Sequence, residues 1–173
     1  MSRLRLVKKA ENTVELIAKA NWCVRVESYS GYSGYENSRD IKPTEADDEA
    51  VDFAQNSFEE SKDILLEVLQ RECPHLVDIW FTLDTDDASS YFYGTFSEEP
   101  DENEKEKFLD EISGQYSDGW GEGLEQNAFK TEEEDEEYEV EDSETGEYYT
   151  EQGNIEHEYF VVLWPDDFKI ELI

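Results

Sequence analysis

The sequence predicts a single α+β domain, over residues 1–173, with an antiparallel sheet, two main helices and an acidic surface. A chain of 173 residues is long enough for one ordinary domain and marginal for two. Aromatic residues make up 13%, which argues against wholesale disorder, because disordered acidic chains are poor in aromatics. The expected order of elements, strands, helix, hairpin, helix and strands, is typical of an α+β fold.

The N-terminal part of the chain is mildly basic and predicts short elements. The first 27 residues hold six bases and three acids. We expect a short strand over residues 3–8, and Asn12 as the cap of a helix over residues 13–20. Residues 22–27 alternate apolar and polar side chains, which indicates a strand.

The two main helices are predicted from caps and apolar spacing. After a Gly/Ser/Tyr loop over residues 28–38, Thr44 serves as an N-cap, and acids crowd the following turn, where the helix dipole favours anions. Apolar residues then recur near a 3.6-residue period up to Cys73, and a proline follows. Residues 100–116 predict the second helix, which a pair of glycines ends.

The remaining strands are predicted from runs of β-branched and aromatic residues. Residues 76–96 indicate a β-hairpin whose turn lies at residues 84–89. A further strand is expected over residues 124–131. Residues 155–164 carry the strongest strand pattern, and residues 168–173 are expected to return antiparallel to it.

The net charge of −33, from 47 acids against 14 bases, restricts the partners of the protein. It repels phosphate backbones and the anionic cytoplasmic leaflet, so we expect no direct nucleic-acid binding and no membrane association. It attracts basic protein surfaces. No signal peptide or membrane-spanning run is evident, which favours a cytoplasmic location with Cys23 and Cys73 as free, buried thiols.

Candidate metal and catalytic motifs all lack essential parts. Residues 84–89 begin like a calcium loop, but Ala88 and Ser89 replace a ligand and the required glycine, so a hairpin turn is expected. His75 and His157 have no zinc-spaced partners. The glycines of residues 119–123 lack the lysine of a phosphate-binding loop. We therefore expect no cofactor, no metal and no enzyme.

The acids are concentrated in one part of the sequence. Between residues 98 and 151 there are 23 acids and three bases, and residues 132–147 predict an acidic flexible loop. B-DNA carries one charge per about 1.7 Å of axis, and a helix advances about 1.5 Å per residue, so acidic helix faces could reproduce that charge density. The predicted acidic face comprises Glu45, Asp47, Asp48, Asp52, Glu59, Glu60, Asp101, Glu102, Glu104, Glu106, Asp110, Glu111, Asp118, Glu122, Glu132, Glu133, Glu134, Asp135, Glu136 and Glu137.

A protein with such a face would block the basic groove of a nucleic-acid-binding protein by competition. Three alternatives stay open. The protein could be an acidic adaptor or chaperone-like regulator of a basic partner, with the energetic centre at Tyr29, Tyr32 and Tyr35. The acids could serve halophilic solubility, which predicts an even distribution. An enzyme would need a carboxylate pair in a closed pocket, and the abundance of acids makes any single pair uninformative in the sequence.

Residues 116–126, Tyr-Ser-Asp-Gly-Trp-Gly-Glu-Gly-Leu-Glu-Gln, follow Gly94-Thr95-Phe96 and an acidic helix. This segment resembles one found in small acidic proteins of phages, plasmids and other mobile elements of Firmicutes. Some acidic proteins of that gene neighbourhood inhibit restriction or CRISPR systems. The resemblance covers about eleven residues.

The resemblance implies a DNA-mimic inhibitor of host defence, present in the host cytoplasm if phage-encoded. Its partner would be a restriction–modification complex or a Cas effector, whose DNA channels are basic. A homodimer would extend such a mimic lengthwise. Within the segment itself, we expect the glycines to form a turn and Trp120 to pack on the core.

Overall fold

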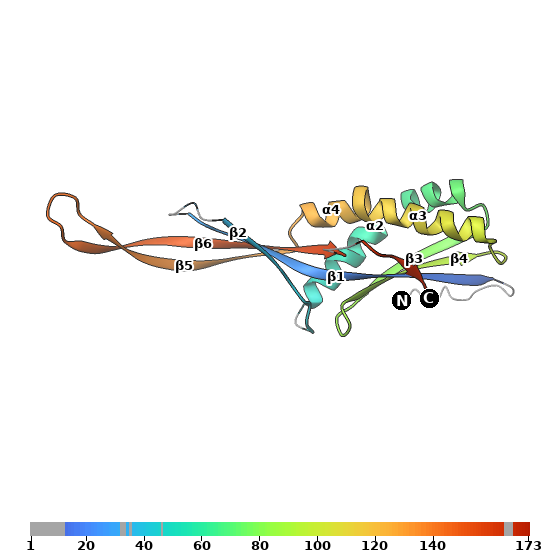
Figure 1. Ribbon diagram of the computed structural model, residues 1–173, viewed down its shortest axis with the longest axis horizontal. Coiled ribbons are helices and arrows are strands. Elements are labelled where there is room, and N and C mark those ends of the chain that lie inside the picture. The colour runs from blue at the N-terminus through green and yellow to red at the C-terminus, as the bar shows by residue number, and fades with distance from the viewer. Residues whose placement is uncertain (1–12, 32–33, 35, 46, 165–167) are drawn as a thin grey trace.

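The computed structural model describes residues 13–31, 34, 36–45, 47–164 and 168–173. These residues form an antiparallel sheet, with helices packed on one face and a long two-stranded projection at one end (Figure 1). The described strands follow the order β3-β4-β1-β6-β5, with β2 and β7 also paired to β1. The predicted α+β class with an antiparallel sheet is confirmed.

Strand β1 (Val14–Ser30) is the spine of the sheet. It pairs with β4 along residues 14–21 and with β6 along residues 22–30. The strand predicted over residues 22–27 is thus confirmed, but the helix predicted over residues 13–20 is wrong. Ala18 and Ala20 are buried, two positions apart, as in a strand with one face on the core. Pairing with β4 stabilises this strand more than the few apolar residues at helical spacing could stabilise a helix. The strand expected over residues 3–8 and the cap at Asn12 lie outside the described residues.

Two short strands border β1. Strand β2 (Glu36–Ile41) pairs with its second half, so the loop predicted over residues 28–38 is shorter than expected. Strand β7 (Glu171–Leu172) is antiparallel to β1, with Leu172 opposite Ala18. The C-terminal segment therefore does return antiparallel, but to β1 and not to the strand before it.

Helix α2 (Asp48–Glu72) confirms the first predicted helix. It begins later than expected because Asp47, and not Thr44, stands at the N-cap position. The Thr44 backbone N–H donates to Asp47 Oδ2 at 2.7 Å, so the two residues form the turn before the helix. The helix ends at Cys73, next to Pro74, as the sequence predicted.

The predicted hairpin is confirmed as β3 (Leu76–Asp84) and β4 (Ser89–Phe96). Its turn is closed by its own carboxylates. Asp84 Oδ1 accepts the backbone N–H of Asp86 at 2.8 Å, and Asp87 Oδ1 accepts that of Ser89 at 3.0 Å. The segment that begins like a calcium loop is therefore a hairpin turn.

Helix α3 (Glu102–Asp118) confirms the second predicted helix, and Asp101 caps it by accepting the Glu104 backbone N–H at 2.9 Å. After a break at Gly119 the chain forms a short helix, α4 (Trp120–Gln126). Trp120 is 8% exposed and packs against the core, as expected. The strand predicted to start at residue 124 is wrong at that end, because Leu124 is buried within α4.

The last hairpin is β5 (Lys130–Glu141) and β6 (Tyr148–Leu163). Its register runs without a break from Lys130 opposite Tyr159 to Glu141 opposite Tyr148. The loop predicted over residues 132–147 is therefore wrong up to residue 141. Cross-strand pairing with β6 organises a sequence whose composition alone indicated a loop. The strand predicted over residues 155–164 is confirmed, and it begins earlier.

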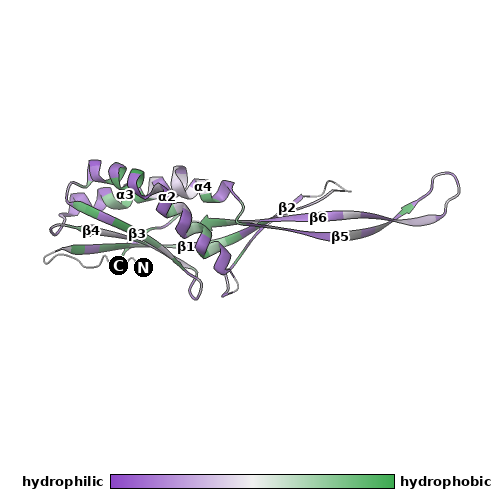
Figure 2. Ribbon diagram, turned by 180° about the vertical axis from the view of Figure 1, so that it is seen from behind, coloured by the Kyte–Doolittle hydropathy of each residue, from purple (hydrophilic) through white to green (hydrophobic). Residues whose placement is uncertain are grey.

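One aromatic core joins the helices to the sheet. Phe58 of α2 makes edge-on contacts with Phe92 and Trp120, and Phe81 lies 4.5 Å from Trp120 between ring centroids. We call the helices and the part of the sheet on which they pack the body. The hydrophobic stretches of the ribbon lie mostly in the body, and the projecting hairpin is mainly hydrophilic (Figure 2). Within the described part of the chain, no helix is both long and apolar enough to cross a membrane.

Candidate functional site

The outer part of the β5–β6 hairpin extends beyond the rest of the sheet, and we call residues 135–154 the arm (Figure 1). β6 pairs with β1 only from Ile155 onward, so within the arm the two strands pair only with each other among the described strands. The turn at its end is closed by Asp142, whose Oδ1 accepts the Glu144 backbone N–H at 2.8 Å. Gly146, with φ at +74°, allows the chain to reverse.

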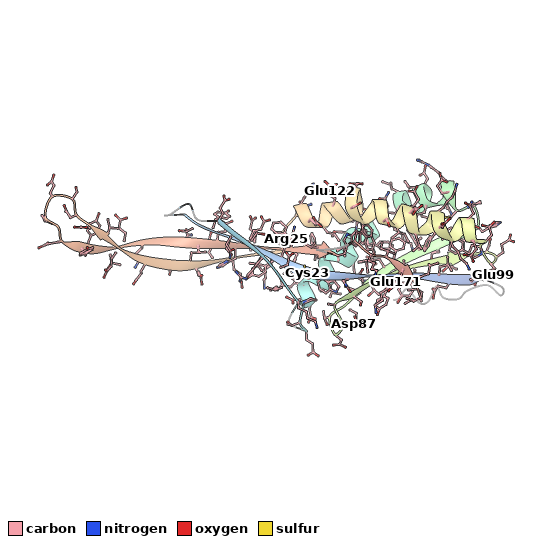
Figure 3. The ribbon with its side chains drawn as sticks, in the orientation of Figure 1. Cys23, Arg25, Asp87, Glu99, Glu122 and Glu171 are labelled. Atoms are coloured by element: carbon pink, nitrogen blue, oxygen red, sulfur yellow. The ribbon has the colours of Figure 1, made fainter. Side chains whose placement is uncertain are left out.

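One face of the hairpin carries a row of acids. Side chains alternate between the two faces of a strand, so every second residue of β5 points to the same side. These residues are exposed, and we call them the acidic row: Glu133, Asp135, Glu137, Glu139 and Glu141. Neighbouring members are about 6.8 Å apart along the strand. Side chains extend from both sides of the hairpin (Figure 3).

The opposite face holds its acids in place by hydrogen bonds. The Tyr159 hydroxyl donates to Glu132 Oε1 at 2.6 Å, and this bond, followed by burial, raises the pKa of Tyr159 to about 12. His157 Nε2 lies 3.2 Å from Glu134 Oε1, while its Nδ1 lies 2.6 Å from Ser28 Oγ. On the face of the acidic row, the Gln152 side-chain amide donates to Glu137 Oε1 at 3.0 Å. The backbone of Glu136 is part of β5, and its side chain is not among those that the structure describes.

Along the strand axis, and counting both faces, the charge density of residues 132–137 of β5 matches that of one nucleic-acid strand. Residues 132–137 are six consecutive acids. A β-strand advances about 3.4 Å per residue, and one DNA strand carries one phosphate per about 3.4 Å of axis. The sequence argument had placed this match on helices. The structure places the densest acids on a strand, where each residue adds one charge at a phosphate-like interval.

The helical members of the predicted acidic face lie apart from the arm, on the body of the molecule (Figure 1). Most of them are exposed, whereas Asp47, Glu111 and Glu122 are only partly so. Glu122 lies on α4 (Figure 3). The exposed members are Glu45, Asp48, Asp52, Glu59, Glu60, Asp101, Glu102, Glu106, Asp110 and Asp118. The predicted face is therefore two separate surfaces, one on β5 and one on the helices and the residues just before them.

Glu104 does not belong to any binding surface, because it is buried at 6% exposure. Its Oε2 accepts the His75 backbone N–H at 3.0 Å, and its Oε1 lies 2.9 Å from His75 Nδ1. The other ring nitrogen of His75 lies 3.0 Å from Glu98. The hydrogen bond to Glu104 is the main cause of a raised pKa for His75. Glu104 thus ties the first turn of α3 to the start of β3, which corrects its predicted role.

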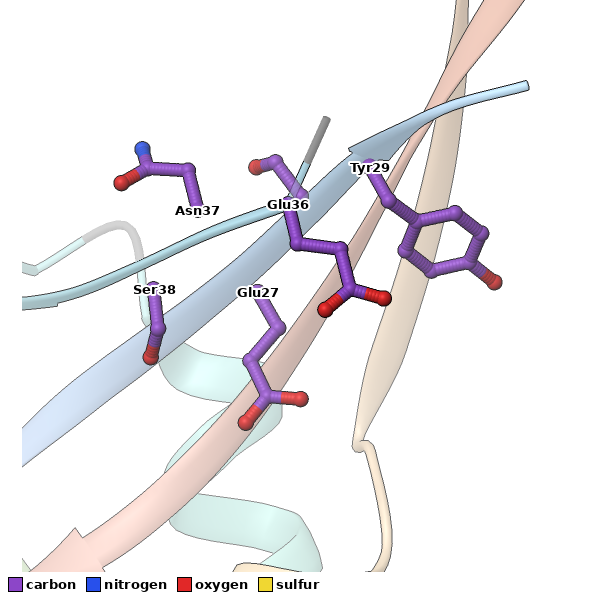
Figure 4. A pocket seen from close by; sticks show the side chains of 6 residues that line it. Glu27, Tyr29, Glu36, Asn37 and Ser38 are labelled. Atoms are coloured by element: carbon purple, nitrogen blue, oxygen red, sulfur yellow. The ribbon is translucent and has the colours of Figure 1, made fainter. Parts of the chain in front are cut away.

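An open hollow of about 390 Å³ lies where β1 and β2 meet. Figure 4 shows the carboxylates of Glu27 and Glu36 on the same side of β1, with Tyr29 beside them. A hydrogen bond to Glu156 is the main cause of a raised pKa for Tyr29. This tyrosine belongs to the predicted aromatic patch, whose other members, Tyr32 and Tyr35, are outside the described residues. The hollow is open to solvent, so it is not the closed carboxylate pocket that an enzyme hypothesis requires.

Two exposed tyrosines at the end of the arm were not predicted. Tyr148 and Tyr149 are 65% and 48% exposed and start β6 directly after the turn. A turn sequence from Asp142 to Gly146 followed by two β-forming aromatics is a recognisable hairpin pattern. This hairpin was not predicted because the acid-rich composition of residues 132–147 indicated a loop.

No group of three or more His, Cys, Asp and Glu side chains in the described ranges is arranged to hold a metal ion. Burial raises the pKa of the Cys73 thiol to about 12, which favours the protonated thiol over the nucleophilic thiolate at neutral pH. No protein-family model matches the chain, and no curated protein sequence matches it either.

Proposed function

We propose that the protein is an acidic DNA mimic that occupies the basic nucleic-acid-binding surface of a host defence protein. The observation that carries this proposal is the run of acids on β5, at the charge spacing of one nucleic-acid strand. The run lies partly on an arm that projects from the body (Figure 1). A slender projection can enter a channel that the body of the molecule cannot.

Carboxylates suit this role because they are fixed anions. They accept forked hydrogen bonds from arginine, as phosphate does. Within the acidic row, Glu137 is already oriented by the hydrogen bond from Gln152, which lowers the conformational entropy that binding must remove. The class of partner, a restriction enzyme or a Cas effector, follows from the resemblance of residues 116–126 and from the basic DNA channels of such proteins.

The test is displacement of labelled DNA from a purified restriction complex and from a purified Cas effector, followed by fluorescence polarisation. We expect displacement by the wild type that weakens as salt rises. Amides should replace the acidic row in one variant: E133Q, D135N, E137Q, E139Q and E141Q. Five exposed ion pairs at about 0.3–1 kcal/mol each predict at least about tenfold weaker displacement.

The matched control neutralises the same number of exposed acids on the helices: E59Q, E60Q, D63N, E102Q and E106Q. It should stay within about threefold of the wild type, because the net charge changes equally and only the location differs. Absence of displacement from both partners, or displacement that does not depend on salt, would contradict the proposal.

A second candidate function is an acidic adaptor that binds a basic partner through aromatic anchors. The exposed Tyr148 and Tyr149 favour it, because tyrosines are frequent energetic centres of interfaces. Under this hypothesis, Y148A/Y149A abolishes partner binding and the acidic-row variant retains it. The mimic hypothesis predicts the reverse order of effects.

A further inference from the structure

β5 is an edge strand with one open side. Its twelve residues pair with β6 alone, and no other described segment pairs with its outer edge. Every second residue of an edge strand directs its backbone N–H and C=O groups away from the sheet. Strands are usually about five or six residues long, so β5 is a long template for a further strand.

The charge of β5 determines which strands can add to it. If the same edge of a second copy paired with it, two acidic strands would lie side by side, and like charges directly opposite each other destabilise a sheet. The edge therefore resists self-association, which long open edges otherwise favour. It also argues against the homodimer that would join two arms along this edge.

The acidic row selects a pattern as well as a charge. An added strand with lysine or arginine at every second position can place all these cations on the same face of the sheet as the acidic row. Each cation is then a cross-strand neighbour of an acid. The other face needs no cations, because Glu132 and Glu134 are bonded to Tyr159 and His157 within the sheet. Backbone hydrogen bonds would provide affinity, and the alternating cations would provide specificity.

We propose that the outer edge of β5 binds an extended basic segment of its partner by strand addition, with lysine or arginine at alternate positions. The inference rests on the proposed function only for the positive charge of the partner. It goes further in requiring backbone pairing, which electrostatic mimicry does not need.

The test compares ten-residue peptides of equal charge at low salt. One alternates threonine and lysine, and a second has the same composition with its lysines in one block. Two further versions of the alternating peptide carry N-methyl groups on one or the other set of alternate backbone nitrogens. We expect the alternating peptide to bind at least tenfold more tightly than the block peptide, and only one of the two methylated versions to lose binding.

Amide hydrogen exchange of β5 provides the structural readout. Binding of the alternating peptide should slow exchange at alternate residues of β5, and the acidic-row variant should bind at least tenfold more weakly than the helix control variant. Equal affinity for all four peptides would overturn strand addition and leave the mimic proposal intact. Strand addition would also be overturned if the alternating peptide did not bind, or if the protein self-associated through β5. Strand addition without any displacement of DNA from the defence proteins would contradict the mimic proposal alone.

Discussion

Gly94 is a residue whose missing side chain is required by the packing around it. A Cβ atom there would lie 2.5 Å from Phe108 Cζ and 3.2 Å from Leu76 Cδ1. Phe108 is fully buried, so it has little room to move. The glycine therefore lets α3 approach the β3–β4 hairpin closely.

Gly94→Ala should lower the free energy of unfolding by about 1–3 kcal/mol, because it overpacks the core. Urea denaturation measures this value. Gly114→Ala is the matched control, since a Cβ at Gly114 meets no atom within 4 Å and an alanine in α3 gains up to about 1 kcal/mol of helix propensity. Equal stability of the two variants would contradict the packing at Gly94.

His75 should make stability depend on pH. Its pKa in the folded protein is raised above the ordinary value of 6.5, chiefly by the hydrogen bond to Glu104, with Glu98 and Asp101 adding their charges. A raised folded pKa means that the stabilisation is fully present below pH 6.5 and is lost as the pH rises through the folded pKa.

The difference in Tm between the wild type and His75→Asn should therefore be larger at pH 5.5 than at pH 9. Thermal unfolding followed by circular dichroism measures it. Glu104→Gln keeps the shape of its side chain but removes the charge, so it should reduce the pH dependence as well. A Tm difference that is the same at both pH values would exclude this role for His75.

At the scale of elements, the arm projects from the packed body of the molecule (Figure 1). No arm residue whose side chain the structure describes belongs to the buried core. The pairing of β1 with β4 and with β6 lies outside the arm, as does the pairing of β3 with β4. We therefore expect that the arm can be removed with little change in the stability of the body.

Replacing residues 136–153 by Asn-Gly, a favoured two-residue hairpin turn, should preserve the fold. We expect a change in Tm of no more than about 4 °C, which corresponds to about 1–2 kcal/mol in a chain of this size. The same variant should lose displacement of DNA from the defence proteins. A cooperative loss of structure on removal of the arm would show that the arm contributes to the core after all.

Two elements show where local sequence patterns were insufficient. Residues 13–20 contain enough apolar spacing for a short helix, but β4 offers a continuous line of pairing partners and the segment becomes a strand. Residues 132–141 have the composition of a loop, but β6 provides a partner in unbroken register. Both errors concern strands, whose stability depends on neighbours distant in the sequence.

At the scale of the whole molecule, the net charge of −33 acts on folding and on binding in opposite directions. Self-repulsion destabilises the compact state, and salt screens it. Attraction to a basic partner is screened by the same ions.

The Tm should therefore rise by about 4 °C or more between 20 mM and 500 mM NaCl, while displacement of DNA weakens over the same range. Differential scanning fluorimetry measures the first effect and fluorescence polarisation the second. Sucrose at equal osmolality serves as the control, because it leaves charge interactions unscreened. A Tm that does not rise with NaCl, or a displacement of DNA that does not weaken with it, would contradict this prediction.

The amino-acid sequence by itself determined the α+β class, both long helices, the β3–β4 hairpin and the concentration of acids between residues 98 and 151. These features depend on local periodicity, caps and composition, which a single chain segment contains. Only the tertiary structure decided that Glu104 is buried against His75 and that the densest acids form a strand that extends onto a projecting arm. Burial and strand pairing depend on which distant segments meet, and neither charge nor periodicity specifies that.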